Sequence, residues 1–232
     1  MQPTDSHAVT SPRPSLLPGE LEIIRWSEPT VEMNLAVDET LAREAGETGR
    51  RVLRLWWGSG TVAVLGAGDK PEQVLNFDEC AKRGVGWIKR VTGGGTVLQT
   101  PGVFNYSYTA PDPHRFDLER VFEQGARLVV DALDRLGVSA QMRGTSDVAV
   151  GDRKISGNAQ ARKWKAVLLH GTLLVDVDIE LMQAVLRHPL KEPDYRRGRP
   201  HSEFVTTLGE LCVCATRAEI EAAFAGAARD VF

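Results

Sequence analysis

The chain has 232 residues, of which 42% are hydrophobic and 25% charged, and its 28 basic and 31 acidic side chains give a formal net charge of −3. This length and composition predict one soluble globular domain and exclude a disordered chain, because a single core stops growing near ~250–300 residues. No apolar run approaches the ~20 residues that cross a bilayer, and the charge balance offers no bulk attraction for nucleic acid.

Residues 1–18 hold four prolines and little apolar periodicity. This predicts a flexible N-terminal segment, followed by a single domain over residues 19–232. The start of the chain has no apolar leader, and its three cysteines, Cys80, Cys212 and Cys214, are an odd set. Both features favour a reducing, cytoplasmic location without a disulfide framework.

The first part of the domain is predicted to contain a strand, a helix and two more strands. The strand is expected over residues 21–26, and Thr30 is the expected N-cap of the helix. The apolar stripe on the inner side of that helix is predicted to be Met33, Ala36, Val37 and Leu41. Residues 51–57 and 60–66, joined by Gly58-Ser59, are predicted to pair as antiparallel strands, with their tryptophans in the core.

Strands predominate in the middle of the chain, and a helix ends it. After a short helix that follows Asn76, strands are expected over residues 86–91, from Val97 onward, and over residues 104–110, 147–150 and 167–175. A long amphipathic helix is predicted from Asp117 to Leu136, ended by Gly137. A capping box of Thr216 and Glu219 is predicted to open the last helix.

Three glycines and a threonine stand where the chain turns between two predicted strands. They are Gly93, Gly94, Gly95 and Thr96, and Arg90 precedes them. Glycine N–H groups can approach a phosphate or carboxylate without obstruction, and the arginine could bind the same anion. A simple tight turn is the alternative. The spacing fits neither the G-x-x-x-x-G-K-[ST] phosphate loop nor the dinucleotide G-x-G-x-x-G pattern.

Lys154 follows a predicted hairpin turn and precedes several small residues. A lysine there is either solvated or a point charge that neutralises a reacting carboxylate and phosphate. Asp147 could pair with that lysine, bind a metal or simply end a strand. His170 is expected to be a hydrogen-bonded core histidine.

Two segments rich in basic residues, 151–165 and 191–201, flank this candidate site. They predict attraction for a nucleotide or an acidic protein. Nucleic-acid binding is not expected, because aromatic residues are not interleaved with the charges. Cys212 and Cys214 would share one face of a strand, and with no second pair or histidine cluster beside them no metal site is expected.

Four segments occur in the order and spacing of a known family. With residues 89–97, 145–148, 151–159 and 170–174 the chain resembles the lipoate-protein ligase family. Residues 34–39 are similar to the first-helix signature of that family. The resemblance covers about residues 21–230, and the superfamily also contains biotin ligases and octanoyltransferases.

The resemblance implies an α/β (α+β) fold in which helices flank a mixed, mostly antiparallel sheet. It implies activation of lipoate or octanoate by ATP with Mg²⁺, and acyl transfer to a lysine of a lipoyl carrier domain or a glycine-cleavage H-like protein. Lys154 matches the catalytic lysine that contacts the acyl carbonyl and the phosphate. The residues that match the substrate- and ATP-binding motifs are Arg90, Gly93, Gly94, Gly95, Thr96, Val97, Leu98, Asp147, Gly157, Asn158, Ala159 and His170.

The chain departs from the family pattern at three places. Gln99-Thr100 stands where ligases commonly carry His-Asp, and Gly102-Val103 replaces Gly-Asn. The chain also ends soon after its last helix, which predicts a separate accessory ligase subunit for adenylation. No cysteine occupies the places that octanoyltransferases use for an acyl-cysteine. The alternatives are a transferase that takes its acyl group from an acyl carrier, and a non-catalytic module that binds an adenylate or an acylated carrier.

Overall fold

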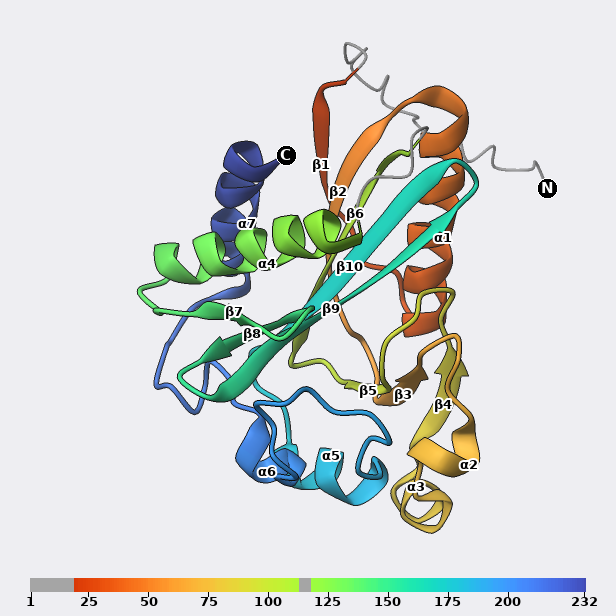
Figure 1. The fold of residues 1–232 in the computed structure, drawn as a ribbon, viewed down its shortest axis with the longest axis vertical. Helices are drawn as coiled ribbons and strands as arrows, with labels where there is room; N and C mark the ends of the chain where they lie inside the picture. The colour runs from red at the N-terminus through yellow and green to blue at the C-terminus, as the bar shows by residue number, and fades with distance from the viewer. Residues whose placement is uncertain (1–18, 113–117) are drawn as a thin grey trace, which may run out of the picture.

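The computed structural model describes residues 19–112 and 118–232 as an α/β fold with two sheets (Figure 1). The flexible segment predicted for residues 1–18 and the predicted helix start at Asp117 lie outside the described residues. The strands are β1 (Leu21–Arg25), β2 (Arg51–Trp57), β3 (Val62–Leu65), β4 (Gly86–Lys89), β5 (Val97–Gln99), β6 (Val103–Pro111), β7 (Gln141–Arg143), β8 (Asp147–Val150), β9 (Arg153–Lys163) and β10 (Ala166–Leu174). The helices are α1 (Val31–Thr48), α2 (Pro71–Val74), α3 (Phe77–Arg83), α4 (Leu118–Arg135), α5 (Ile179–Val185), α6 (His201–Phe204) and α7 (Arg217–Val231).

The main sheet has seven strands in the order β1-β2-β6-β10-β9-β8-β7. β1 lies parallel to β2, and each of the other neighbouring pairs is antiparallel. A second sheet has the order β4-β3-β5, in which β3 is parallel to β4 and antiparallel to β5. The expected mixed, mostly antiparallel fold with flanking helices is confirmed, although the strands divide into two sheets.

The antiparallel pair predicted for residues 51–57 and 60–66 is wrong, because β2 and β3 belong to different sheets. Between them, the N–H of Gly58 donates to the carbonyl of Val103 at 3.3 Å. A Cβ at Gly58 would lie 2.6 Å from the carbonyl oxygen of Thr100. The chain therefore crosses from one sheet to the other against the β5–β6 connection, where the Gly58-Ser59 pair resembled a hairpin turn only in sequence.

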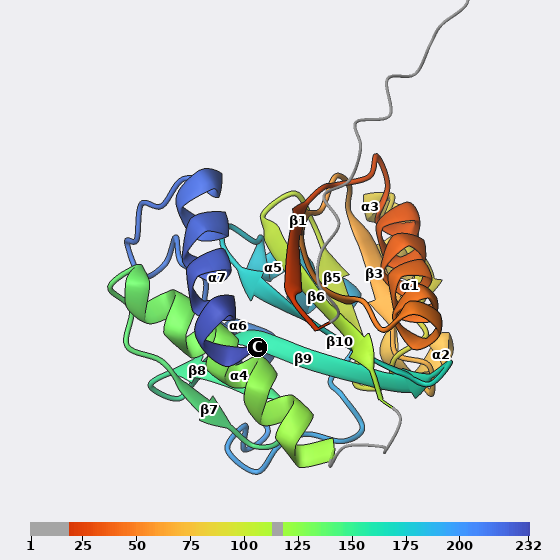
Figure 2. The same cartoon turned by 90° about the horizontal axis from the view of Figure 1, so that it is seen from above.

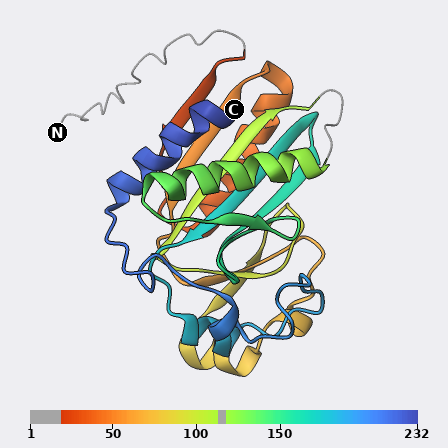
Figure 3. The same ribbon diagram turned by 60° about the vertical axis from the view of Figure 1, so that its left-hand side comes forward.

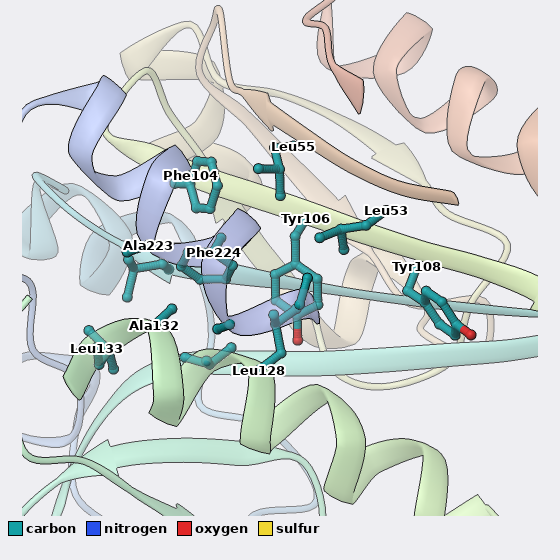
Figure 4. Close-up of a cluster of buried hydrophobic side chains, with 14 of the residues drawn as sticks. Leu53, Leu55, Phe104, Tyr106, Tyr108, Leu128, Ala132, Leu133, Ala223 and Phe224 are labelled. Carbon is teal, nitrogen blue, oxygen red and sulfur yellow. The ribbon is translucent and has the colours of Figure 1, made fainter. Parts of the chain in front are cut away.

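Helices cover both faces of the main sheet, with α4 and α7 on one face and α1 on the other (Figure 2). Side chains of β2 alternate between these faces, as successive residues of a strand must. Leu53 and Leu55 pack with the cluster that includes Leu128 of α4 and Phe224 of α7 (Figure 4). Arg54 and Trp56 lie on the α1 face, where Arg54 reaches the helix and Trp56 belongs to a separate small cluster. Figure 3 shows the small sheet, α5 and α6 gathered at one end of the main sheet.

Polar residues form much of the buried side of α1, so the predicted apolar stripe is wrong. Met33 is 47% exposed, whereas Asn34 and Asp38 are fully buried. The cause is Arg54, which is 0% exposed and donates to Asp38 Oδ1 at 2.8 Å and to the Asn34 carbonyl at 3.0 Å. A buried guanidinium requires such partners, and they must come from the facing helix. The buried positions of α1 are Val31, Asn34, Asp38, Ala42 and Ala45.

Local signals predicted the helix ends well. The hydroxyl of Thr30 accepts from the Met33 N–H, and Thr216 and Glu219 form the expected capping box. Gly137, with a φ of 79°, follows the end of α4. The strand predicted around Cys212 and Cys214 is absent from the described residues, since Cys212 lies in a turn with a φ of 57°. Within residues 19–112 and 118–232, no helix combines the length and the apolar character needed to cross a bilayer.

Replacing Arg54 by Met is expected to lower the free energy of unfolding by about 3–5 kcal/mol, because Asp38 would remain buried without its charged partner. Arg83→Met is the matched control, since the ion pair of Arg83 with Glu79 is exposed on α3. That change should cost far less, because solvent screens an exposed ion pair. Urea unfolding measures both values, and equal losses in the two variants would contradict the importance assigned to the buried pair.

Candidate functional site

Two adjoining cavities lie between the main sheet and the small sheet. The inner cavity has a volume of about 150 Å³ and the outer one about 740 Å³. The outer volume is within the range of about 300–1,000 Å³ that small-molecule sites occupy. Both cavities are lined by Gly94, Gly95, Thr96, Val97, Ser146, Lys154, Gly157 and Thr172. The two cavities therefore meet at Lys154 and the glycine loop, residues 93–96, and form one cleft.

Arg90 holds the glycine loop in shape. Its Nη2 donates to the carbonyls of Gly93 at 2.6 Å and Gly95 at 2.8 Å, and its Nη1 donates to the carbonyl of Val64 at 3.1 Å. Burial lowers the pKa of Arg90 to about 10. The sequence suggested that this arginine could bind an anion over the loop. Its guanidinium borders the inner cavity, but its hydrogen bonds are directed to the backbone of the loop and of β3 and to the Thr92 hydroxyl.

The loop also packs closely against the turn that follows β3. A Cβ at Gly66 would lie 1.9 Å from the Gly94 carbonyl oxygen, and Gly94 itself has a φ of 81°. Both positions therefore require glycine, one for space and the other for backbone conformation. Asp69 completes the contact by accepting a hydrogen bond from the Thr96 hydroxyl at 2.8 Å. The sequence analysis did not identify Asp69. The Gly-x-Gly-Asp pattern of residues 66–69, directly after a strand, was the signal that could have indicated it.

His170 connects α1 to the glycine loop through buried side chains. Its Nε2 lies 2.7 Å from the Thr92 hydroxyl, and that hydroxyl accepts from Arg90 Nε at 2.9 Å. Its Nδ1 lies 3.9 Å from Asp38 Oδ2. Burial is the main cause that lowers the pKa of His170, which favours the neutral ring. The expected hydrogen-bonded core histidine is present, and it also lines the inner cavity.

Lys154 lies at the junction of the two cavities, near the start of β9. Its Nζ is 2.6 Å from Asp147 Oδ1 on the neighbouring strand β8, so Asp147 is the lysine partner among the roles considered for it. The other oxygen of Asp147 accepts from the Tyr195 hydroxyl at 2.9 Å. A Cβ at Gly157 would lie 2.7 Å from the lysine Nζ, so the ammonium group lies in the space that a side chain at position 157 would enter.

The inner cavity contains side chains that the sequence did not mark. Trp56 forms part of its wall, and its indole N–H has no hydrogen-bond partner among the described residues. Gln99 and Asn105 also line it, with Gln99 Nε2 donating to Asn105 Oδ1 at 2.6 Å. The Tyr106 hydroxyl donates to Asn158 Oδ1. Gln99, which stands where ligases commonly carry histidine, therefore forms a buried amide pair with Asn105 at this cavity.

Most of the proposed site residues meet at this cleft. Those that line at least one cavity are Arg90, Gly94, Gly95, Thr96, Val97, Leu98, Asp147, Lys154, Gly157, Asn158, Ala159 and His170. Gly93 belongs to the loop through its bond to Arg90 but lines neither cavity. Cys80 is buried, and its Sγ lies 3.9 Å from the carbonyl oxygen of Val185. Cys212 and Cys214 are exposed and line neither cavity.

The outer cavity carries several basic side chains. Its wall includes Lys154, Arg187, Lys191, Arg196 and His201, with the last three from the segment between α5 and the end of α6. Acidic residues on the same wall are Asp69, Asp147 and Glu192. Within the described residues, no three His, Cys, Asp or Glu side chains gather as a metal site would require. The arrangement is suited to an anionic ligand that meets Lys154.

A family model described as the lipoyl protein ligase A/B catalytic domain matches residues 30–228. The chain belongs to this family. It is 31% identical over 156 residues to a putative lipoate-protein ligase A of Aeropyrum pernix, a match that covers 67% of this chain and 58% of the relative. It is also 31% identical over 145 residues to a probable lipoate-protein ligase A of Mycoplasma pneumoniae, covering 62% and 42%. The match spans about half the length of these curated relatives.

Solved structures of the family share the fold. A bi-partite lipoate protein ligase from Thermoplasma acidophilum, studied with its E2 lipoyl domain, is 25% identical with a TM-score of 0.79, over 91% of this chain and 83% of that one. A lipoate-protein ligase A bound with ATP is 24% identical with a TM-score of 0.78, over 93% and 85%. The second similarity supports the fold alone.

His201 is expected to stay neutral in the folded protein down to about pH 4, because burial and the charges of Arg196, His188 and Lys154 lower its pKa to that value. In the unfolded chain a histidine has a pKa of about 6.5. Between about pH 4 and 6.5 the unfolded state therefore binds more protons than the folded state. The stability that His201 contributes above about pH 6.5 is lost as the pH falls towards 4. An NMR titration of the ring measures the pKa directly, and His201→Gln should flatten this part of the stability profile. A ring that titrates near pH 6.5 would contradict the burial described.

Proposed function

We propose that this chain activates lipoate with ATP to form lipoyl-adenylate, and then transfers the lipoyl group to a lysine of a lipoyl carrier domain. The observation that carries the proposal is the position of Lys154, a cation at the junction of a small inner cavity and a large outer one. The inner cavity suits the acyl chain and the outer one the nucleotide. The cation at the junction would lie beside the lipoate carboxylate and the α-phosphate of ATP, the two groups between which the new bond forms.

The relatives support this reading of the cleft. One structure of similar fold, from T. acidophilum, contains bound lipoic acid, and another is a ligase bound with ATP. The bi-partite ligase of T. acidophilum was studied with its E2 lipoyl domain, which makes a lipoyl domain the favoured acceptor here. The bi-partite organisation also supports a separate accessory subunit for this chain. Octanoate is the alternative acid, and a glycine-cleavage H-like protein the alternative carrier.

In the first half-reaction, a lipoate carboxylate oxygen attacks the α-phosphorus of ATP. A bond forms between them, the bond from the α-phosphorus to the bridging oxygen breaks, and pyrophosphate leaves with the electron pair. Two anions must approach each other, and the Lys154 ammonium lowers their repulsion and stabilises charge on the phosphoryl oxygens. The glycine loop lines both cavities at this point, which leaves backbone rather than bulky side chains beside the phosphate.

In the second half-reaction, the ε-amine of the carrier lysine attacks the acyl carbonyl carbon of lipoyl-adenylate. The amide bond forms, the bond to the phosphate oxygen breaks, AMP leaves with the electron pair, and the amine nitrogen loses a proton to solvent. Lys154 polarises the carbonyl during the attack. Asp147 and Gly157 position the ammonium group for both steps, one by the ion pair and the other by leaving space.

Mg²⁺ fits this site as an ion carried by the nucleotide. Such sites use one or two carboxylates together with substrate phosphates rather than a cage of protein ligands. Asp69 on the outer wall would supply a carboxylate oxygen of this kind, whereas both oxygens of Asp147 are engaged by Lys154 and Tyr195. The ion would neutralise phosphate charge during adenylation.

A transferase that takes its acyl group from an acyl carrier is the second candidate. Its usual chemistry needs a nucleophilic cysteine at the cleft. Neither cavity is lined by a cysteine within the described residues, and burial raises the pKa of the Cys80 thiol, which opposes the reactive thiolate. Ligase chemistry is therefore favoured over a thioester relay.

Modification of a lipoyl domain is expected to depend on ATP. The protein is incubated with lipoate, ATP, Mg²⁺ and the domain, with and without an accessory ligase subunit, and the mass of the domain is measured. Modification that persists without ATP when an acyl carrier is supplied would reject the ligase in favour of the transferase. Tight binding of lipoyl-adenylate without turnover from any donor would instead indicate a non-catalytic module.

Lys154→Ala is expected to slow both half-reactions by about 100-fold or more, the effect of removing a charge-stabilising group from a transition state. Pyrophosphate release measures the first step, and transfer from synthetic lipoyl-adenylate measures the second. Lys163→Ala is the control, because Lys163 is an exposed lysine at the far end of the same strand. Circular dichroism checks that both variants fold. Retention of either half-reaction at the rate of the control would refute the role given to Lys154.

A further inference from the structure

We infer that Arg196 and His201 form an anion subsite for the β- and γ-phosphates of ATP, the part that leaves as pyrophosphate. The inference rests on the proposed function and assigns a role to the segment 193–205, which forms part of the wall of the outer cavity. Neither residue belongs to the motifs by which the sequence resembles its family.

Arg196 is buried at the wall of the outer cavity, and one of its guanidinium nitrogens has no partner within the part of the chain that the structure describes. Its residue exposure is 4%, and its Nη2 has no hydrogen-bond partner among the described residues. Its Nε donates to the Arg199 carbonyl at 2.9 Å, and the guanidinium lies 4.7 Å from the ring centroid of Phe204. Glu192, the acidic group in ion-pair range, is 3.6 Å from Nε. An unpaired buried donor is costly, so an arginine kept in this state at a cavity wall points to an anionic ligand.

The segment that carries Arg196 is fastened to the strand of Lys154. The hydroxyl of Tyr195, the residue before Arg196, donates a hydrogen bond to Asp147, which is the ion-pair partner of Lys154. After α6, the Thr206 N–H donates to the Lys154 carbonyl at 2.8 Å, and Val205 bridges to Lys154 as a parallel partner. One end of the segment is therefore tied to the ion-pair partner of Lys154 and the other to the backbone of Lys154, which constrains the guanidinium relative to the proposed bond-forming centre.

His201 adds a second nitrogen-bearing group to the same wall. It is 9% exposed, and it lines the outer cavity with Arg196. The positive charges that act on it belong to Arg196, His188 and Lys154, and together with burial they keep its ring neutral. A bound polyanion would offset these charges, so His201 could take up a proton and become a donor to the ligand.

The position of the subsite separates the two half-reactions. Pyrophosphate is present only while the adenylate forms, because the acyl transfer releases AMP. A cation that binds the leaving group stabilises negative charge as the phosphorus–oxygen bond breaks. Arg196 should therefore matter for adenylation and not for transfer, whereas Lys154 serves both steps.

The first test uses inorganic pyrophosphate as the probe and the His201 ring as the reporter. Pyrophosphate is expected to bind the wild-type chain and to raise the pKa of His201 in an NMR titration, with the signal assigned by its loss in His201→Gln. Arg196→Gln should weaken this binding about tenfold or more, the effect of losing one charge-assisted contact. Arg197→Gln is the matched control, because Arg197 is the next residue, is exposed and lines neither cavity. Equal weakening in both variants, binding that leaves His201 unchanged, or no binding to the wild-type chain would overturn the inference.

The second test measures the half-reactions separately, with the accessory subunit present if adenylation requires it. Arg196→Gln is expected to slow lipoyl-adenylate formation about tenfold, chiefly through KM for ATP, and to leave transfer from synthetic lipoyl-adenylate unchanged. If Arg196→Gln forms lipoyl-adenylate as fast as an active wild type, the anion subsite is refuted while the proposed function stands. A wild type that performs neither half-reaction, yet binds pyrophosphate through Arg196, would refute the proposed function and leave the anion subsite standing.

Discussion

The burial of one guanidinium, that of Arg54, determines how the α1 face of the main sheet is built. At 0% exposure the group has no water to solvate it, so the facing helix must supply Asp38 and backbone oxygen. Asp38 in turn faces His170, and His170 contacts Thr92, which accepts from Arg90. Arg90 fixes the carbonyls of the glycine loop. The geometry of the proposed adenylation site thus depends on a charge buried on another strand.

The other wall of the cleft depends on short-range contacts. Lys154 and Asp147 lie on adjacent strands joined by a tight hairpin, so a short stretch of chain brings the two charges of the ion pair together. The segment 193–205 then attaches to this pair through Tyr195 and lines the outer cavity. The cleft combines a framework fixed by the sheet and its helices with a wall made largely of irregular chain, which is the usual division between scaffold and binding loops.

Sequence patterns predicted those features whose causes are local. The N-cap at Thr30, the hairpin before Lys154 and the strands around the glycine loop depend on neighbouring residues, and they are found as expected. Features that depend on distant residues were not predictable in this way. The apolar stripe of α1 was misplaced because nothing near Met33 reveals Arg54 on a later strand. The pairing of β2 with β3 was wrong because β2 lies between β1 and β6 in the main sheet, whereas β3 lies between β4 and β5 in the small one. The motif identified Arg90 as a site residue, but the motif did not predict that its guanidinium would bind the carbonyls of the glycine loop.

The buried chain of contacts from α1 to the glycine loop also has an evolutionary consequence. Since Asp38 balances Arg54, a change of charge at either position leaves the other without compensation in a place that water does not reach. Single substitutions there should be rare during divergence. Lineages that have rebuilt this interior should instead have exchanged positions 38 and 54 together, which would make the pair a marker for subgroups of the family.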